Sequence, residues 1–141
     1  MERLLNIIRV GLHKSPGATI RQVKAAAQSI SYKLPDDYVE LLLWSNGAEG
    51  FIGEEYWVLW SVEEIGELNL AYQVGNYLPG MLAIGSDGGG ECIALDYRRQ
   101  NPEPALVRVP FGDLSPESII QLGSNLSEGI HRALAGSERQ V

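Results

Sequence analysis

The chain has 141 residues and a single cysteine, Cys92, so it cannot form an internal disulfide and fits a reducing compartment. Its length suffices for one domain with a real core, and its hydrophobic fraction of 45% argues against disorder. No apolar run approaches the ~20 residues of a membrane-spanning helix, and the N-terminal run, interrupted by Asn6 and Arg9, has no cleavage pattern after it. We therefore expect one domain over residues 1–141, soluble and cytoplasmic, with no role at a membrane.

The net charge of −7 is unevenly distributed along the chain. Residues 35–97 carry twelve Asp and Glu and no Lys, Arg or His, whereas residues 1–34 have a net charge of +5 and residues 98–141 are balanced. Such a one-sided acidic block repels nucleic acid and attracts a basic protein. The alternative is that these carboxylates face many directions and only keep the protein soluble.

Two helices are expected before residue 31. Apolar side chains at three- and four-residue steps predict an amphipathic helix over residues 2–12, which the sequence from Lys14 to Gly17 ends. Thr19 and Gln22 then have the spacing of a capping box, in which each side chain accepts a hydrogen bond from the other residue's backbone. The buried stripe of the second helix is expected to consist of Ile20, Val23, Ala27 and Ile30.

A third helix is expected to begin at Pro35, because proline suits a first helical turn and Asp36 and Asp37 face the positive end of the helix dipole. Asn46 and Gly47 supply a left-handed end to this helix. Its inward face is expected to comprise Tyr38, Leu41, Leu42 and, at its margin, Ser45.

The next segment alternates between loop, strand and helix. Residues 47–53 are expected to form a loop, and residues 55–60, dense in aromatic and β-branched side chains, a strand. Ser61 and Glu64 have capping-box spacing and open a further helix, after which residues 76–80 turn the chain. The inward residues of that helix are expected to be Val62, Ile65, Leu68 and Tyr72.

A glycine-rich hairpin over residues 81–97 is expected to be the centre of the fold. Two apolar runs, residues 81–84 and 92–95, flank a Ser-Asp-Gly-Gly-Gly segment, whose glycines tolerate positive φ and whose Asp87 can bond its own backbone. The loop is longer than two residues, so we expect a bulge or a longer connection. Each arm must bury a face, and the rest of the chain is expected to pack on this hairpin.

After the hairpin we expect a polar loop over residues 98–104 and a strand over residues 105–109 that Pro110 ends. Residues 118–122 fit a helix and a strand about equally well. The last helix is expected to be capped by Ser124, to bury Leu126, Ile130 and Leu134, and to end at Gly136. Because short connections favour antiparallel pairing, the predicted fold class is α+β, a single domain with helices flanking a largely antiparallel sheet.

No pattern in the sequence indicates catalysis, a metal or a cofactor. Residues 85–90 resemble a phosphate-binding loop only superficially, because Glu91 and Cys92 stand where a Walker loop needs Lys and then Ser or Thr. The two histidines are far apart in the sequence, and one cysteine cannot build a zinc site of any common spacing. Adjacent carboxylates, such as Glu54 and Glu55, fit solvated surface better than an acid–base pair, because sequence neighbours usually point different ways.

Trp57 and Trp60 are candidates either for the core or for a partner contact. They lie three apart in a predicted strand and so project to opposite faces. One is expected inside, and the other could lie exposed beside Glu54 and Glu55, where a Trp would anchor an interface. The alternative is that both pack in the core or at its rim. Cys92, in a predicted strand, is expected to be a buried thiol rather than a reactive one.

From residue 34 to residue 97 the sequence resembles the SUKH superfamily, which includes a yeast regulator of cell-wall synthesis and many bacterial proteins. The resemblance lies in Leu34-Pro35-Asp36-Asp37-Tyr38, Leu41-Leu42, Ser45-Asn46-Gly47, Leu59-Trp60-Ser61, Glu64-Ile65, Asn69, Tyr77-Leu78-Pro79-Gly80 and Ile84-Gly85-Ser86-Asp87-Gly88-Gly89-Gly90-Glu91. One departure is Gln28, since the second helix often carries an acidic residue there. The resemblance implies an α+β domain without catalytic activity. Bacterial members typically act as immunity proteins, which bind and neutralise toxins that are often nucleases.

The acidic block and the resemblance lead to one hypothesis. We expect a non-catalytic immunity protein, a monomer or weak homodimer, that meets a basic toxin domain with an acidic face. The candidate partner-binding residues are Glu54, Glu55, Trp57, Glu63, Glu64, Asp87 and Glu91, with no catalytic or metal-binding residue. The alternatives are a regulatory scaffold in cell-wall or stress signalling, and an enzyme or small-ligand-binding domain with a pocket near Asp87 and Glu91.

Overall fold

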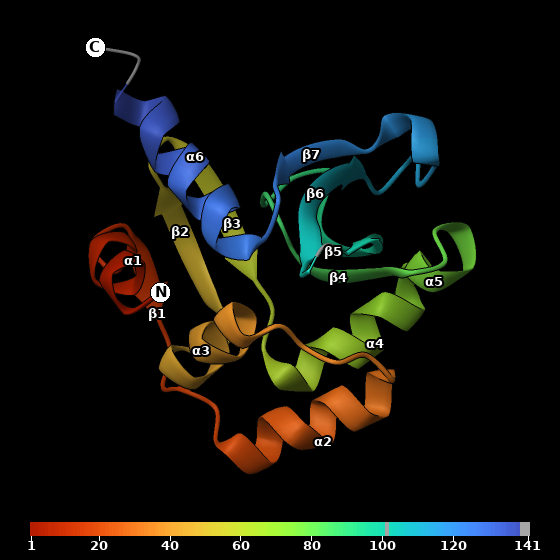
Figure 1. Cartoon of the computed structure of the whole chain (residues 1–141), viewed down its shortest axis with the longest axis horizontal. Coiled ribbons are helices and arrows are strands. Elements are labelled where there is room, and N and C mark those ends of the chain that lie inside the picture. The colour runs from red at the N-terminus through yellow and green to blue at the C-terminus, as the bar shows by residue number, and fades with distance from the viewer. Residues whose placement is uncertain (101, 139–141) are drawn as a thin grey trace.

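Every strand of the sheet pairs antiparallel with the strand that follows it in the chain (Figure 1). The computed structural model describes residues 1–100 and 102–138, and its sheet has the order β1-β2-β3-β4-β5-β6-β7. The strands are β1 Leu12–Lys14, β2 Ala48–Ile52, β3 Glu55–Leu59, β4 Met81–Ser86, β5 Glu91–Gln100, β6 Pro104–Pro110 and β7 Ile120–Gly123. The predicted α+β class with a largely antiparallel sheet is confirmed.

The helices pack in two groups around this sheet. They are α1 Glu2–Ile8, α2 Ile20–Ile30, α3 Asp36–Trp44, α4 Val62–Ala71, α5 Val74–Tyr77 and α6 Leu126–Glu138. Helices α1, α3 and α6 contact one another, and α6 also lies against β2, β6 and β7. On the other side α4 and α5 pack on β4, while α2 lies beside α4 at the bottom of Figure 1.

The N-terminal part of the chain differs from the prediction at two places. The first helix ends at Ile8 rather than at residue 12, and Leu12 lies in β1, opposite Gly50. Residues 47–53, predicted as a loop, contain β2, which pairs with both β1 and β3. Gly11 and Gly50 sit backbone against backbone, and the absence of a Cβ on both lets β1 and β2 approach closely.

The central hairpin joins β4 to β5 through the four-residue turn 87–90. Met81 lies opposite Asp96 and Ser86 opposite Cys92, with a register shift between Ala83 and Gly85. Strand β5 continues to Gln100, so the predicted polar loop over residues 98–104 is wrong in its first half.

The C-terminal segment settles one open prediction and corrects two others. Residues 116–118 form a 3₁₀ turn, and β7 follows it, so the undecided stretch is mainly extended. The cap of α6 is Asn125 rather than Ser124, because the Asn125 side-chain oxygen accepts the Glu128 N–H at 2.8 Å. The helix also runs past Gly136, which does not end it.

Both predicted capping boxes are present, at the starts of α2 and α4. The inward face of α3 is confirmed, since Tyr38, Leu41, Leu42 and Ser45 are all buried. Two residues predicted to face inward do not: Ile20 is 52% exposed and Tyr72 is 44% exposed. Tyr72 instead caps the end of α4 and stacks on Phe111 with ring centroids 4.2 Å apart.

Candidate functional site

Four of the six predicted carboxylates lie where two strand turns meet. Glu54 is in the β2–β3 turn and Glu55 begins β3, while Asp87 and Glu91 flank the β4–β5 turn. The two turns are neighbours, because a Cβ added to Gly88 would lie 2.8 Å from Cδ2 of the Tyr56 ring. We call this region the strand-tip surface and define it as Glu49, Phe51, Glu54, Glu55, Tyr56, Asp87 and Glu91.

The carboxylates of the strand-tip surface differ in how far they are neutralised. Asp87 accepts the backbone N–H groups of Gly89 at 2.8 Å and Glu91 at 3.1 Å, so its negative charge stiffens the turn. The Glu91 carboxylate lies 3.4 Å from the Arg108 guanidinium. Glu54 and Glu55 are both exposed.

The aromatic side chains of this surface are those of Phe51, which is exposed, and Tyr56, which is half-buried, and not that of Trp57. Phe51 is 53% exposed and packs edge-on against Tyr56, with ring centroids 5.1 Å apart. The Tyr56 hydroxyl donates to the Glu49 carboxylate, and this bond raises the pKa of Tyr56. An aromatic pair among carboxylates offers both apolar area and negative charge to a partner.

Trp57 is only 1% exposed and Trp60 6%, so both indoles belong to the core and Trp57 offers no surface to a partner. Sequence reasoning missed Phe51 because its segment was interpreted as a loop. The side chains of residues 48–52 are buried and exposed in turn in the structure, but the exposed face carries the apolar Phe51, so the sequence shows no alternation of apolar and polar residues here.

The other two predicted carboxylates, Glu63 and Glu64, stand at the opposite end of β3. Strand β3 has five residues and so spans about 15 Å between Glu55 and the start of α4. Glu63 accepts two hydrogen bonds from the Asn46 amide, at 2.9 and 3.0 Å, and Glu64 accepts the Ser61 N–H at 3.0 Å. The predicted carboxylates therefore form two groups rather than one continuous face.

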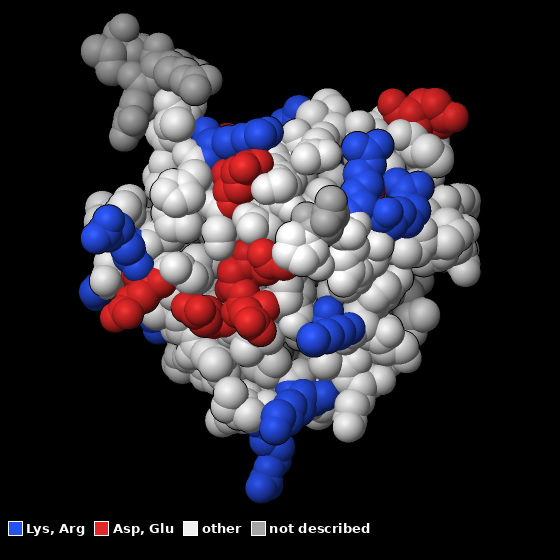
Figure 2. Space-filling view, viewed as in Figure 1, with Lys and Arg blue, Asp and Glu red and all other residues white. Residues whose placement is uncertain are grey.

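Charges of both signs share the face seen in Figure 2. Acidic side chains gather near the middle of this face, around the starts of α3 and α6, and Lys and Arg lie around them. Two members of the acidic block are buried: Asp37, and Asp96, whose carboxylate lies 3.1 Å from Arg98 and 3.7 Å from Arg99. Cations from the flanking segments thus neutralise part of the block.

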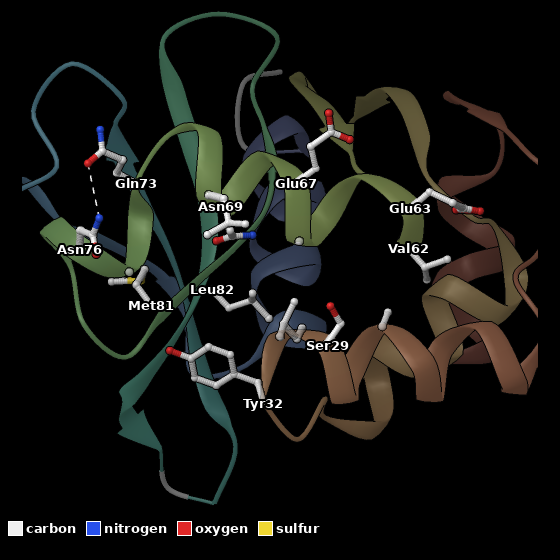
Figure 3. A pocket seen from close by; sticks show the side chains of 15 residues that line it. Ser29, Tyr32, Val62, Glu63, Glu67, Asn69, Gln73, Asn76, Met81 and Leu82 are labelled. Carbon is white, nitrogen blue, oxygen red and sulfur yellow. Dashed lines mark hydrogen bonds between the residues drawn. The ribbon is translucent and has the colours of Figure 1, made fainter.

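A groove of about 480 Å³ runs between α2 and α4 and opens over the start of β4 (Figure 3). Its apolar lining includes Ile30, Tyr32, Leu70, Met81 and Leu82, and its polar lining includes Ser29, Glu63, Glu67, Gln73 and Asn76. Neither Asp87 nor Glu91 lines this groove. The groove is therefore not the pocket near those two residues that the small-ligand alternative requires.

Cys92, the cysteine of the chain, is buried in β5. Burial raises the pKa of Cys92 to about 12, so the group is a neutral thiol and not a nucleophilic thiolate at neutral pH. In residues 1–100 and 102–138, no three His, Cys, Asp or Glu side chains gather closely enough to hold a metal ion. No helix within the same residues is long and apolar enough to span a membrane.

A comparison with models of known protein families identifies the family of this chain. The model of the SMI1 / KNR4 family (SUKH-1) matches residues 17–132, from the residues before α2 into α6. The chain belongs to the SUKH-1 family. The match extends the resemblance seen at residues 34–97 to most of the sheet and helices. The SUKH family includes toxin-immunity proteins and yeast SMI1/KNR4-like regulators, and its domains are generally non-catalytic and often bind proteins. The chain matches no curated protein sequence.

Proposed function

We propose that this SUKH-1 protein is a non-catalytic immunity protein that acts in the cytoplasm and neutralises a basic toxin domain through its strand-tip surface. The observation that carries the proposal is the pair of the exposed Phe51 and the half-buried Tyr56 among the carboxylates Glu49, Glu54 and Glu55. Family membership supports the choice of a protein partner over a substrate. The same family also supports the choice of a toxin as that partner.

The two kinds of side chain have separate tasks in this proposal. Exposed carboxylates steer a basic partner and raise the rate of association, an effect that salt screens. An aromatic side chain that becomes buried in the complex slows dissociation, because aromatic anchors supply much of the affinity of an interface. Asp87 and Glu91 contribute less to steering, because one stiffens its turn and the other faces Arg108.

The test needs a toxin, and the natural first candidate is a toxin domain encoded beside this gene. Expressing that domain should arrest growth, and coexpressing this chain should restore it. If coexpression does not restore growth and the two proteins do not bind, the immunity function is wrong for that pair. A gene neighbourhood of signalling proteins would instead favour the regulatory role of the yeast relatives.

Charge reversal tests the surface. Glu54→Lys with Glu55→Lys should lower the association rate constant about tenfold at low salt and flatten its salt dependence. Phe51→Ala should mainly raise the dissociation rate constant. The matched control is Glu117→Lys, an exposed glutamate at the far edge of the sheet beside β7, which should change neither rate by more than about twofold.

The carboxylates of α4 are the competing surface. Glu63→Lys with Glu67→Lys leaves the Glu64 cap in place and reverses the same amount of charge. Under the proposal this pair has a smaller effect on association than the reversal at Glu54 and Glu55. The opposite ranking would move the toxin interface to α4.

A further inference from the structure

We infer that the groove between α2 and α4 binds a short segment of a partner protein in which an apolar side chain stands beside a Lys or Arg. The groove adjoins the start of α4, whereas the strand-tip surface lies at the other end of β3. The inference therefore goes beyond the toxin interface and shares with the proposed function only the assumption that the occupant is a protein.

The lining of the groove includes Gly66 of α4, where this helix meets α2. A Cβ added to Gly66 would lie 3.7 Å from Cγ2 of Ile30, an ordinary contact distance, so Ile30 of α2 packs against α4 at this end of the groove. From there the groove passes Ser29 and opens over Tyr32 and Leu82 (Figure 3). Its volume of about 480 Å³ is that of a site for a few side chains.

The walls of the groove are held in place by contacts outside it. The Tyr32 ring stacks on Tyr97 with centroids 4.5 Å apart, and the Tyr97 hydroxyl donates to the Lys33 carbonyl at 2.7 Å. Opposite, the Asn69 side chain is bound to Ala83 of β4. A preformed groove spares a ligand the cost of ordering its site.

The lining calls for an apolar group from the occupant. Leu70 lines the groove and is 80% exposed, whereas Ile30 and Tyr32, which also line it, are half-buried. Covering Leu70 removes apolar area from water, which favours an aliphatic or aromatic side chain at this position.

The charges of the lining call for a cation. Glu63 and Glu67 line the groove, and none of the residues found to line it in the described chain is Lys, Arg or His. The cations of α2 lie elsewhere: Arg21 and Lys24 border a separate depression with Ile20. An occupant that brings a Lys or Arg to the α4 rim therefore meets uncompensated negative charge.

Filling the groove tests the inference without removing any of its contacts. Gly75 lines the groove, and a Cβ added there would meet no atom within 4 Å, so Gly75→Phe projects a ring into open space. Gly112→Phe is the matched control, because Gly112 also has no atom within 4 Å and is exposed in the turn after β6. The probes are two fluorescein-labelled peptides of alternating Leu and Lys or alternating Leu and Glu.

The Leu/Lys peptide should bind the wild-type chain, as measured by fluorescence anisotropy, and shift the amide NMR signals of Gly66, Leu70 and Gly75. Gly75→Phe should weaken this binding at least about tenfold, the size expected for blocking an interface pocket, and Gly112→Phe should leave it unchanged. The Leu/Glu peptide should not bind. If Gly75→Phe does not fold, Leu70→Ser replaces it, with an expected weakening of several-fold.

Three outcomes overturn the inference: no peptide binding, equal binding to Gly75→Phe and wild type, or shifts confined to the strand-tip surface. A small metabolite that stabilises the wild type but not Gly75→Phe against heat, while no peptide binds, also overturns it in favour of a small-ligand site. Toxin neutralisation that survives Gly75→Phe but fails in Glu54→Lys with Glu55→Lys leaves the proposed function intact. The two proposals can thus fail separately.

Discussion

The side-chain amide of Asn69 on α4 hydrogen-bonds to both backbone polar groups of Ala83 on β4. Ala83 N–H donates to Asn69 Oδ1 at 2.9 Å, and Asn69 Nδ2 donates to the Ala83 carbonyl at 2.8 Å. Strand β3 pairs with β4 only through Val58 and Leu59, so it has already ended where Ala83 needs a partner. Asn69 thus completes the hydrogen bonding of a buried strand from a helix.

Asn69→Ala should therefore lower the free energy of unfolding by about 2–4 kcal/mol, because it leaves two buried backbone groups at Ala83 unpaired. Asn69→Asp should cost nearly as much, since it keeps the acceptor but loses the donor to the Ala83 carbonyl. Urea denaturation measures both. Asn76→Ala removes only an exposed 3.4 Å bond to Gln73 and should change stability by less than about 0.5 kcal/mol. Equal effects at the two positions would contradict this role of Asn69.

The second prediction concerns the contact between α3 and α6. The buried Asp37 carboxylate accepts the backbone N–H of Ser127 at 3.1 Å and its hydroxyl at 3.0 Å, which caps the start of α6 from 90 residues away. Asp37→Ala should lower the free energy of unfolding by about 1–3 kcal/mol. Asp36→Ala, at the exposed neighbouring position of the same helix turn, should cost about 0.5 kcal/mol. Hydrogen exchange at Ser127 should quicken only in the Asp37 variant.

The third prediction separates two glycines of the β4–β5 turn. Gly88 has φ of +82° and lies against the Tyr56 ring, whereas a Cβ on Gly90 would meet no atom within 4 Å. Gly88→Ala should therefore lower the free energy of unfolding by about 1–2 kcal/mol and disturb the Phe51–Tyr56 pair, as seen in the aromatic NMR signals. Gly90→Ala should leave those signals in place. Similar spectra for both variants would show that the turn does not support the strand-tip surface.

The fourth prediction concerns pH and the buried thiol. Burial raises the pKa of Cys92 from 9.0 to about 12, so between these values the unfolded chain releases a proton that the folded chain keeps. Stability is therefore fully present below pH 9 and falls as pH rises above it, by about 1 kcal/mol between pH 8 and pH 10 from this group. Cys92→Ala should remove that share of the alkaline loss. A thiol reagent should label Cys92 only at the rate of unfolding, and rapid labelling in the native state would contradict its burial.

Features that depend on residues close together in the sequence were largely predictable. Thr19 with Gln22 and Ser61 with Glu64 form capping boxes because the partners lie three residues apart in one chain segment. The inward face of α3 followed from spacing alone, and the α+β class followed from the order of the elements.

Most of the wrong predictions concern residues whose neighbours are far away in the sequence. Leu12 and Phe51 lie in strands because β1 and β2 pair across the 33 residues of helix and loop from 15 to 47, and no local signal competes with that pairing. Ser124 and Asn125 are both residue types that cap helices, but it is the Asn125 side chain that accepts the Glu128 N–H at the start of α6. Trp57 was among the candidate partner-binding residues, but its side chain is buried in the core.

The sequence by itself determined the fold class, the family resemblance and the excess of negative charge in residues 35–97, because these depend on composition, order and short spacings. Only the tertiary structure decided which carboxylates stand together. It placed Glu54 and Glu55 beside Phe51 and Glu63 beside the α2–α4 groove, and it buried Asp37 and Asp96. The physical reason is that neighbours across a sheet or between helices are set by long-range packing, which a single sequence does not display.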